Sequence, residues 1–132
     1  MTFYTAFAEH YEAIFPFSEG VYAFLREHLP GPPAQVLDVG CATGLYTGRL
    51  ARDGYAATGV DLDAAMIAVA RARYPLATFQ VLDMTRIEDL DRVFGGTFCI
   101  GNTAAHLTRA QFSDFVGSLG ATPRPGGPWT LQ

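Results

Sequence analysis

Short apolar runs alternate with helix-length segments along most of this chain, and this alternation constrains the fold more than any other feature. Runs bounded by glycine, proline or acidic residues are typical of buried strands, and strands separated by helices form parallel sheets. The sequence therefore predicts an α/β fold with a doubly wound, mostly parallel sheet and helices on both faces. The predicted strands are Gln35–Val39, Tyr55–Val60, Thr78–Leu82, Thr97–Ile100 and the start of a fifth at Trp129–Leu131.

Capping signals mark the helices between these strands. Ser18 is placed to cap a helix that precedes a proline-rich turn, and Asp63 is placed to cap a helix over Ala64–Arg73. The segment Leu45–Asp53 predicts another helix, with Gly54 as its C-terminal cap. Each helix therefore has a physical reason to begin or end where the pattern changes.

The composition predicts a single domain over residues 1–132. With 49% hydrophobic and 17% charged residues, the chain can bury one core and is too apolar to be disordered. Arg, Asp or Glu interrupts every long apolar stretch, so no membrane span is expected. The aromatic, acidic N-terminus does not resemble a secretory signal, and we therefore expect a cytoplasmic protein.

Charge and cysteine usage argue against two classes of partner. The net charge is −4, and the nine basic residues are arginines scattered along the chain, so no basic stripe is available for a nucleic acid. Cys41 and Cys99 lie far apart without the spacing of a metal site, so we expect no metal and two buried thiols.

Polar residues follow the predicted strands at the points where they end. They are the segment Asp38–Gly44, Asp61, Asp83 and the pair Gly101 and Asn102. Because ligands of open parallel sheets bind outside the carboxyl ends of the strands, these residues are expected to converge on one site.

The segment Asp38–Gly44 favours a ligand without phosphates. Gly40 and Gly44 permit a tight turn and a close approach to the backbone, but the spacing of small residues at 40, 42 and 44 departs from the dinucleotide fingerprint. The carboxylate of Asp38 would repel a pyrophosphate and suits an ammonium or sulfonium group.

The next two strand ends supply groups for a nucleoside. Asp61 is placed to accept the two hydroxyls of a ribose. Asp83 can accept from an adenine amino group, while the backbone N–H of Met84 reaches a ring nitrogen. Together these groups predict adenosine with a positively charged amino-acid tail, which is S-adenosylmethionine.

The chain resembles class I S-adenosylmethionine-dependent methyltransferases, of the small-molecule type. The resemblance implies a Rossmann-like fold with strand order 3-2-1-4-5, a helical lid at residues 1–33 and a core at 34–132. FAEHYEAIFP (Phe7–Pro16) is similar to the helix that closes over the cofactor, and CIGNTAAHL is similar to a stretch in glycine and sarcosine N-methyltransferases. The motifs that carry the resemblance are VLDVGCATG (Val36–Gly44), GVDLD (Gly59–Asp63), VLDM (Val81–Met84), CIGNTAAHL (Cys99–Leu107) and RPGG (Arg124–Gly127).

The resemblance also implies a role for individual residues. Asp38 and the glycine-rich loop would line the methionine part of the cofactor, Asp61 would hold the ribose, and Leu62 would lie against the adenine. The stretch from Cys99 to Asn102 would form the floor near the reactive methyl, with Asn102 contacting the substrate. The implied cofactor-binding set is Tyr4, Asp38, Gly40, Cys41, Ala42, Gly44, Asp61, Leu62, Asp83, Met84, Cys99 and Gly101.

Two residues are candidates for the chemical step. His106 is the candidate general base, although it could equally bond only to the backbone. Tyr11, together with Tyr4, could close over the cofactor or direct an acceptor amine, or could serve only in aromatic packing. Asp38, Asp61 and Asp83 have the alternative role of capping the segments that follow them.

The chain departs from the family pattern in three places. Ala42 replaces the usual middle glycine, and Thr97–Phe98 stands where relatives have Phe-Asp before the fourth strand. Family members continue for two more strands after the fifth, whereas this sequence ends at Gln132. An uncapped fifth strand leaves unpaired backbone groups, so we expect either a truncated chain or a homodimer that covers this edge.

The expected reaction is methyl transfer to a small-molecule acceptor, with nitrogen favoured over oxygen and S-adenosylhomocysteine as product. Two alternatives stay open at this point. A non-catalytic S-adenosylmethionine-binding module would keep the nucleoside site without a substrate pocket. An NAD-dependent oxidoreductase is disfavoured by Asp38 and by the spacing of the glycines.

Overall fold

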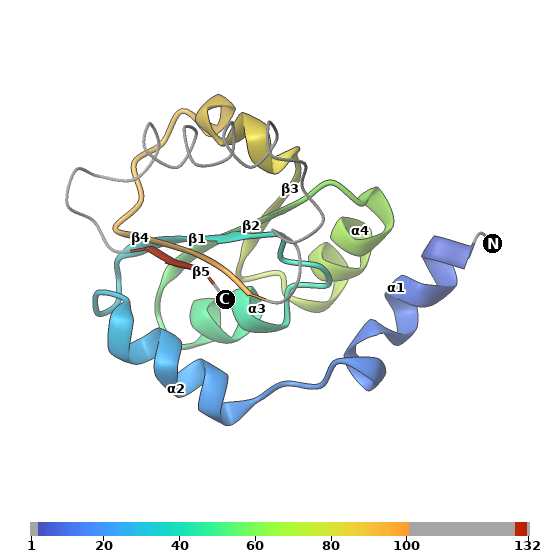
Figure 1. The fold of residues 1–132 in the computed structure, drawn as a ribbon, viewed down its shortest axis with the longest axis horizontal. Helices are drawn as coiled ribbons and strands as arrows, with labels where there is room; N and C mark the ends of the chain where they lie inside the picture. Colours follow the sequence, from blue (N-terminus) through green and yellow to red (C-terminus); the bar gives the residue numbers. More distant parts are fainter. Residues whose placement is uncertain (1–2, 101–128, 132) are drawn as a thin grey trace.

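The computed structural model describes residues 3–100 and 129–131, with side chains described for residues 7–100. These residues form helices and strands that alternate for most of the chain (Figure 1). In chain order the elements are α1 (Phe3–Ile14), α2 (Glu19–His28), β1 (Gln35–Val39), α3 (Leu45–Arg52), β2 (Ala56–Asp61), α4 (Ala64–Arg73), β3 (Thr78–Val81), the 3-10 helix η1 (Met84–Leu90), β4 (Gly96–Cys99) and β5 (Trp129–Leu131).

The sheet has the order β3-β2-β1-β4-β5, and every adjacent pair of strands is parallel. This order confirms the prediction of a doubly wound sheet that starts at its centre with β1 and reverses direction between β3 and β4. Strand β1 therefore pairs with β2 along one edge and with β4 along the other, and the residues that follow β1 lie where the winding reverses. In open parallel sheets, ligands bind at the carboxyl ends of the strands where the winding reverses.

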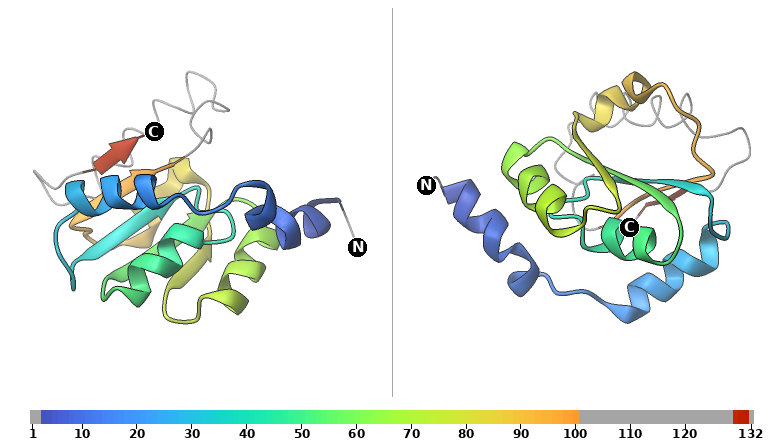
Figure 2. Two further views of the ribbon diagram at one scale, coloured as in Figure 1. Left: turned by 90° about the horizontal axis from the view of Figure 1, so that it is seen from below. Right: turned by 180° about the vertical axis from the view of Figure 1, so that it is seen from behind.

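Helices cover both faces of the sheet, as predicted. In Figures 1 and 2, α3 and α4 lie side by side on one face, while η1 lies on the other. Alternate residues of β1 divide between these faces, because successive side chains of a strand point in opposite directions. Leu37 and Val39 pack with the buried residues of η1, whereas Val36 packs with α2 and α3.

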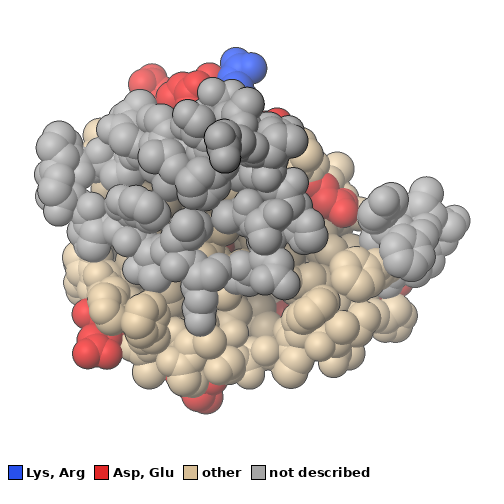
Figure 3. Space-filling model, viewed as in Figure 1, with Lys and Arg blue, Asp and Glu red and all other residues tan. Residues whose placement is uncertain are grey.

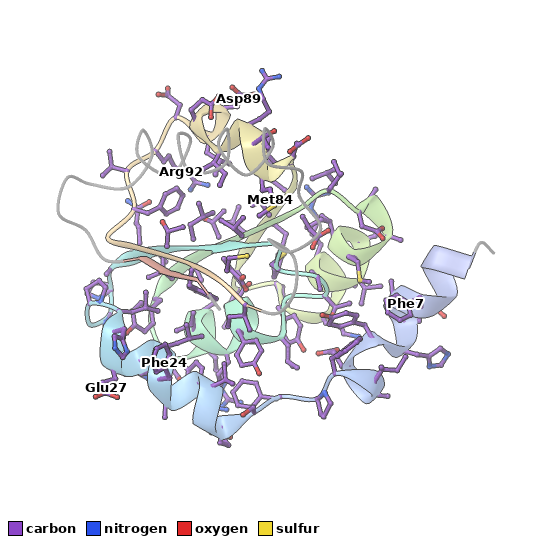
Figure 4. The ribbon with its side chains drawn as sticks, in the orientation of Figure 1. Phe7, Phe24, Glu27, Met84, Asp89 and Arg92 are labelled. Carbon is purple, nitrogen blue, oxygen red and sulfur yellow. The ribbon has the colours of Figure 1, made fainter. Side chains whose placement is uncertain are left out.

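Helix α2 is part of the core, although it belongs to the segment that was predicted to be a lid. Tyr22, Leu25 and Leu29 are buried, and they pack with Val36, Leu50 and other residues of the α3 face. The side chain of Glu27 points outward from the same helix (Figure 4). An amphipathic face of this kind gains stability mainly from tertiary packing.

The helix boundaries follow the capping signals of the sequence. The side chain of Ser18 accepts a hydrogen bond from the N–H of Val21, and that of Asp63 accepts from the N–H groups of Ala65 and Met66. Gly54 has a φ of +102° directly after the end of α3, as expected for a residue in this position. Two of the five predicted strands, Gln35–Val39 and Trp129–Leu131, have the predicted bounds, and the other three differ by one residue at one or both ends.

Three further sequence expectations have structural outcomes. Within residues 3–100 and 129–131, no helix is long and apolar enough to cross a membrane. Cys41 and Cys99 are both buried, and no disulfide joins them. Thr97 and Phe98 lie inside β4, where both are buried, and they pair in register with Leu37 and Asp38 of β1.

Gly48 of α3 is required by a close approach to α4. A Cβ atom at this position would lie 2.3 Å from the Tyr74 ring, whereas a Cβ atom at Gly20 of α2 would meet only Ser18 Oγ, at 3.8 Å. We expect Gly48→Ala to lower the free energy of unfolding by about 1–3 kcal/mol, because the ring must move. The matched change Gly20→Ala should raise it by up to about 1 kcal/mol through helix propensity. Urea unfolding followed by circular dichroism measures both, and a Gly48→Ala protein as stable as the parent would contradict this packing.

Candidate cofactor-binding site

The candidate site residues follow the strands at a shared edge of the sheet. Because β1, β2, β3 and β4 are parallel, their last residues all lie at this edge. The glycine-rich loop at residues 40–44 follows β1, and Asp61 is the last residue of β2. Asp83 comes two residues after β3. The structure therefore brings together three segments that the sequence separates by about twenty residues each.

The loop at residues 40–44 is tied to the tip of β2 by backbone hydrogen bonds. The N–H groups of Gly40 and Cys41 both donate to the carbonyl of Val60, at 2.8 and 2.9 Å. The N–H of Ala42 donates to Asp61 Oδ2 at 2.8 Å. A phosphate-binding loop instead directs its N–H groups at the ligand. These bonds therefore argue against the dinucleotide alternative.

Two glycines let this loop pack against β2 and β3. Gly44 has a φ of +82°, and a Cβ atom there would lie 2.5 Å from the Phe79 ring. A Cβ atom at Gly59 would lie 2.9 Å from Cys41 Sγ, so the absence of a side chain at Gly59 makes room for the thiol. Cys41 consequently packs inward with Phe79, and its thiol donates to the carbonyl of Ala42 at 3.5 Å.

Asp38 is a buried carboxyl on the α3 side of β1. Its Oδ2 accepts a hydrogen bond of 2.7 Å from the hydroxyl of Thr47, which is fully buried in the first turn of α3. The pKa of Asp38 is raised to about 7, mainly by burial and to a smaller extent by the nearby charge of Asp61, while the hydrogen bond from Thr47 acts in the opposite direction. Near neutral pH this carboxyl is therefore poised between its charged and neutral forms.

Asp61 holds the loop with one oxygen and its own turn with the other. Besides the bond from Ala42, Oδ1 accepts from the N–H of Asp63 at 2.9 Å. Burial raises the pKa of Asp61, and the backbone hydrogen bonds from Asp63 and Ala42 act in the opposite direction. Each carboxylate oxygen has a second lone pair, so these bonds leave acceptor capacity for a ligand hydroxyl.

Helix α1 brings a phenol to these carboxyl groups. Burial raises the pKa of Tyr11, and the charges of Asp61 and Asp38 act in the same direction. Its ring packs against Phe7 and Phe15 at centroid separations of 5.8 and 5.0 Å. Figure 4 shows Phe7 on the side of α1 that faces the body of the protein.

A charged contact attaches α1 to α4. The carboxylate of Glu12 bonds to the guanidinium of Arg73 and to the hydroxyl of Tyr74, and Arg73 also donates to the carbonyl of Glu9. Burial raises the pKa of Tyr74, as does its hydrogen bond to Glu12. Tyr74 also packs against Gly48, so this contact links α1 to both α4 and α3.

The three residues predicted to contact the adenine differ in how far their side chains are exposed. Leu62 follows β2 directly, and its side chain is 69% exposed, so it is available to contact an apolar group. Asp83 accepts from the N–H and the hydroxyl of Thr85, at 2.9 and 2.8 Å, and these bonds lower its pKa. The side chain of Met84 is buried and points from η1 toward the sheet, so only its backbone is available at the binding edge (Figure 4).

The remaining candidates divide between the core and the part of the chain outside the described residues. Cys99 is buried at the end of β4. Gly101, Asn102 and His106 lie outside the described residues, as does the side chain of Tyr4. Sequence reasoning missed Thr47, whose signal is a hydroxyl in the first turn of the helix that follows the glycine-rich loop.

The described part of the site is acidic. Among residues 7–100, no basic side chain forms an ion pair with Asp38 or Asp61. On the face shown in Figure 3, the basic atoms of described residues lie at the top edge, beside acidic atoms. No group of three or more His, Cys, Asp and Glu in the described ranges is arranged to hold a metal ion. Fold and site together define a Rossmann-like domain whose binding edge suits a cationic nucleoside.

The chain belongs to the methyltransferase domain family. The family model described as "Methyltransferase domain" matches residues 36–127, which include all but the first residue of β1, the whole of β2, β3 and β4, and the loops that follow β1, β2 and β3. This membership agrees with the strand order and with the acidic residues at the ends of β1 and β2.

Comparison with individual proteins identifies several similar methyltransferases. The chain is 34% identical over 113 residues to the dTDP-3-amino-3,6-dideoxy-alpha-D-glucopyranose N,N-dimethyltransferase of Streptomyces fradiae, covering 81% of this chain and 44% of that protein. SAM-bound CalS10, an amino pentose methyltransferase from Micromonospora echinaspora, is 30% identical with a TM-score of 0.75, covering 92% of this chain and 54% of that one.

A third protein shares the fold at lower identity. The TehB-like SAM-dependent methyltransferase from Corynebacterium glutamicum has a TM-score of 0.74 at 23% identity, covering 89% of this chain and 67% of that one. Two curated relatives match most of this chain, and the chain spans slightly less than half of the length of each of them.

Asp61 is expected to stabilise the site before any ligand binds. Asp61→Ala leaves the N–H groups of Ala42 and Asp63 without their acceptor. The loss affects a strained position, because Ala42 has a φ of +51°, in the left-handed region. We expect this change to lower the free energy of unfolding by about 1–3 kcal/mol. The control Asp63→Asn retains an N-cap oxygen and should cost less than about 0.5 kcal/mol. Thermal unfolding of the ligand-free proteins compares the two, and equal stabilities would show that the tie contributes little.

Proposed function

We propose that this chain forms the S-adenosylmethionine-binding part of a methyltransferase that acts on a small molecule, with an amine nitrogen as the acceptor. The observation that carries the proposal is the pair of carboxyl groups, Asp38 and Asp61, at the ends of adjacent strands without a basic partner among the described residues. Beside them, the loop at residues 40–44 has committed N–H groups to the protein. A cation without phosphates fits both features.

The proposed contacts divide the cofactor into three parts. Asp38 and the backbone of Gly40, Cys41, Ala42 and Gly44 face the amino-acid tail, where the ammonium and sulfonium carry positive charge. Free lone pairs of Asp61 accept the ribose hydroxyls. Leu62 covers the adenine, whose edge meets Asp83 and the backbone of Met84. Cys99, at the end of β4, lies below the reactive methyl in this arrangement, and the resemblance implies the same role for Gly101 and Asn102, which are outside the described residues.

The proposed reaction is an in-line displacement at carbon. The lone pair of the acceptor nitrogen attacks the methyl carbon as the bond from carbon to sulfur breaks, and the sulfur keeps the electron pair as S-adenosylhomocysteine. The nitrogen then loses its proton to solvent or to His106. The sulfonium is already activated, so the protein mainly aligns the nucleophile and excludes water. Tyr11, on the helix that serves as the lid, orients the acceptor.

The choice of a nitrogen acceptor is supported by two relatives. The name of the Streptomyces fradiae protein gives an amino sugar as its substrate and N,N-dimethylation as its reaction. CalS10 is described as an amino pentose methyltransferase. A "Ubiquinone biosynthesis O-methyltransferase" from Nitrosococcus oceani, at 31% identity, is the corresponding argument for oxygen. An amine therefore has the broader support.

Cofactor binding tests the first half of the proposal. Calorimetry should detect binding of S-adenosylmethionine and S-adenosylhomocysteine, and no binding of NADH, because a pyrophosphate would face Asp38. Asp61→Ala should weaken S-adenosylmethionine binding by about 1–3 kcal/mol, which is about 5- to 150-fold in Kd, through loss of the ribose acceptor. Asp63→Asn is the matched control. Binding of NADH, without binding of S-adenosylmethionine, would favour an oxidoreductase.

Methyl transfer tests the second half. With S-adenosylmethionine and a panel of small acceptors, methylated product should form with amines, including nucleotide-linked amino sugars, and less with matched alcohols. Tyr11→Phe keeps the aromatic packing but removes the hydroxyl, and we expect kcat/KM to fall by about tenfold or more with Kd for the cofactor unchanged. Mass spectrometry of the products measures methyl transfer to each acceptor and kcat/KM, and calorimetry measures the Kd for the cofactor. Tight cofactor binding with no transfer to any acceptor would favour a non-catalytic binding module.

A further inference from the structure

A buried carboxyl in this site lacks the counter-charge that such a group needs. Within residues 7–100, the hydrogen bond from Thr47 is the one that the structure gives the carboxyl of Asp38. Thr47 is a neutral donor, and both side chains are buried. Burying an ionised carboxylate with one neutral partner is costly, so the group either takes a proton or receives a cation.

Among the described residues, the titratable groups that interact with Asp38 supply no cation. Asp61 approaches from β2, Cys41 from the loop and Tyr11 from α1, while α3 contributes the hydroxyl of Thr47 and β4 places Phe98 opposite in register. Burial raises the pKa of both the Cys41 thiol and the Tyr11 phenol above their ordinary values, so both are neutral at physiological pH. The remaining neighbour, Asp61, adds negative charge when it ionises.

We propose that Thr47 is a positioning residue that holds Asp38 ready to ionise, so that binding of S-adenosylmethionine expels a proton from Asp38 into solvent. This inference rests on the proposed function. The O–H bond of the Asp38 carboxyl breaks, water or buffer accepts the proton, and the ligand supplies the positive charge that replaces it. The hydroxyl of Thr47 directs the ionised oxygen and stabilises its charge before the ligand arrives.

The proton linkage has a definite sign. In the ligand-free protein the pKa of Asp38 is raised to about 7, and a bound cation lowers it. Binding is therefore favoured as pH rises through this range, and the Kd for S-adenosylmethionine should be about tenfold weaker at pH 6 than at pH 8. The ligand's own amino group also titrates near pH 8. The ratio of wild type to Asp38→Asn removes that contribution, because both proteins bind the same ligand.

Calorimetry in buffers of different ionisation enthalpy counts the protons released by S-adenosylmethionine binding. At pH 6 we expect the wild-type protein to release close to one proton more than Asp38→Asn, and at pH 8 the difference should vanish. Thr47→Val keeps the shape but removes the donor, so its pH profile should shift to higher pH. Thr47→Ser restores the donor and should restore the profile. Thermal unfolding establishes that each variant is folded.

Three outcomes would overturn the inference, each in a different way. A wild-type protein that binds S-adenosylmethionine with the same pH dependence and proton count as Asp38→Asn would show that Asp38 releases no proton. A folded Thr47→Val with the wild-type profile would remove Thr47 from the mechanism. If Thr47→Val does not fold, the comparison with Asp38→Asn still decides the release. A failure to bind S-adenosylmethionine at any pH would instead defeat the proposed function.

Discussion

The tie between the glycine-rich loop and the tip of β2 is the interaction on which the rest of the site depends. The carbonyl of Val60 accepts two loop N–H groups, and Asp61 accepts a third. With these bonds in place, the loop can hold Ala42 in a left-handed conformation and begin α3 at Leu45. The start of α3 in turn delivers Thr47 to Asp38. One set of hydrogen bonds thus sets both the shape of the site and the position of its buried carboxyl.

The same tie determines what the site can bind. A glycine-rich loop in a Rossmann-like sheet commonly offers its N–H groups to phosphates. Here the N–H groups of Gly40, Cys41, Ala42 and Gly44 all donate within the protein, and the carboxyl groups described at this edge include those of Asp38 and Asp61. The loop therefore presents an electronegative surface with little capacity to donate hydrogen bonds. Helix α1 adds a neutral phenol in an aromatic setting, held in place by the contact of Glu12 with Arg73 and Tyr74.

Much of this arrangement could be predicted from local sequence. The succession of strands and helices, the caps at Ser18 and Asp63, and the grouping of acidic residues at strand ends follow from periodicity and turn chemistry, which act over a few residues. The strand order was implied by the resemblance to methyltransferases, and the structure confirms it. The burial of the Cys41 thiol was expected from the sequence, whereas the inward direction of the Met84 side chain could not be predicted from local sequence. Both placements depend on space created elsewhere, by Gly59 for the thiol and by the η1 face of the sheet for the thioether.

The sequence by itself determined the succession of strands and helices, because that succession needs only alternating apolar runs and the residues that interrupt them. It also determined that carboxylates would meet at one edge, since parallel strands end on the same side. Only the tertiary structure decided how those carboxylates are used. Burial, the hydrogen bond from Thr47 of α3 and the charge of Asp61 at the end of β2 set the pKa of Asp38, and each depends on residues from different elements. Electrostatic free energies depend on such distances and on solvent exclusion, which sequence order does not contain.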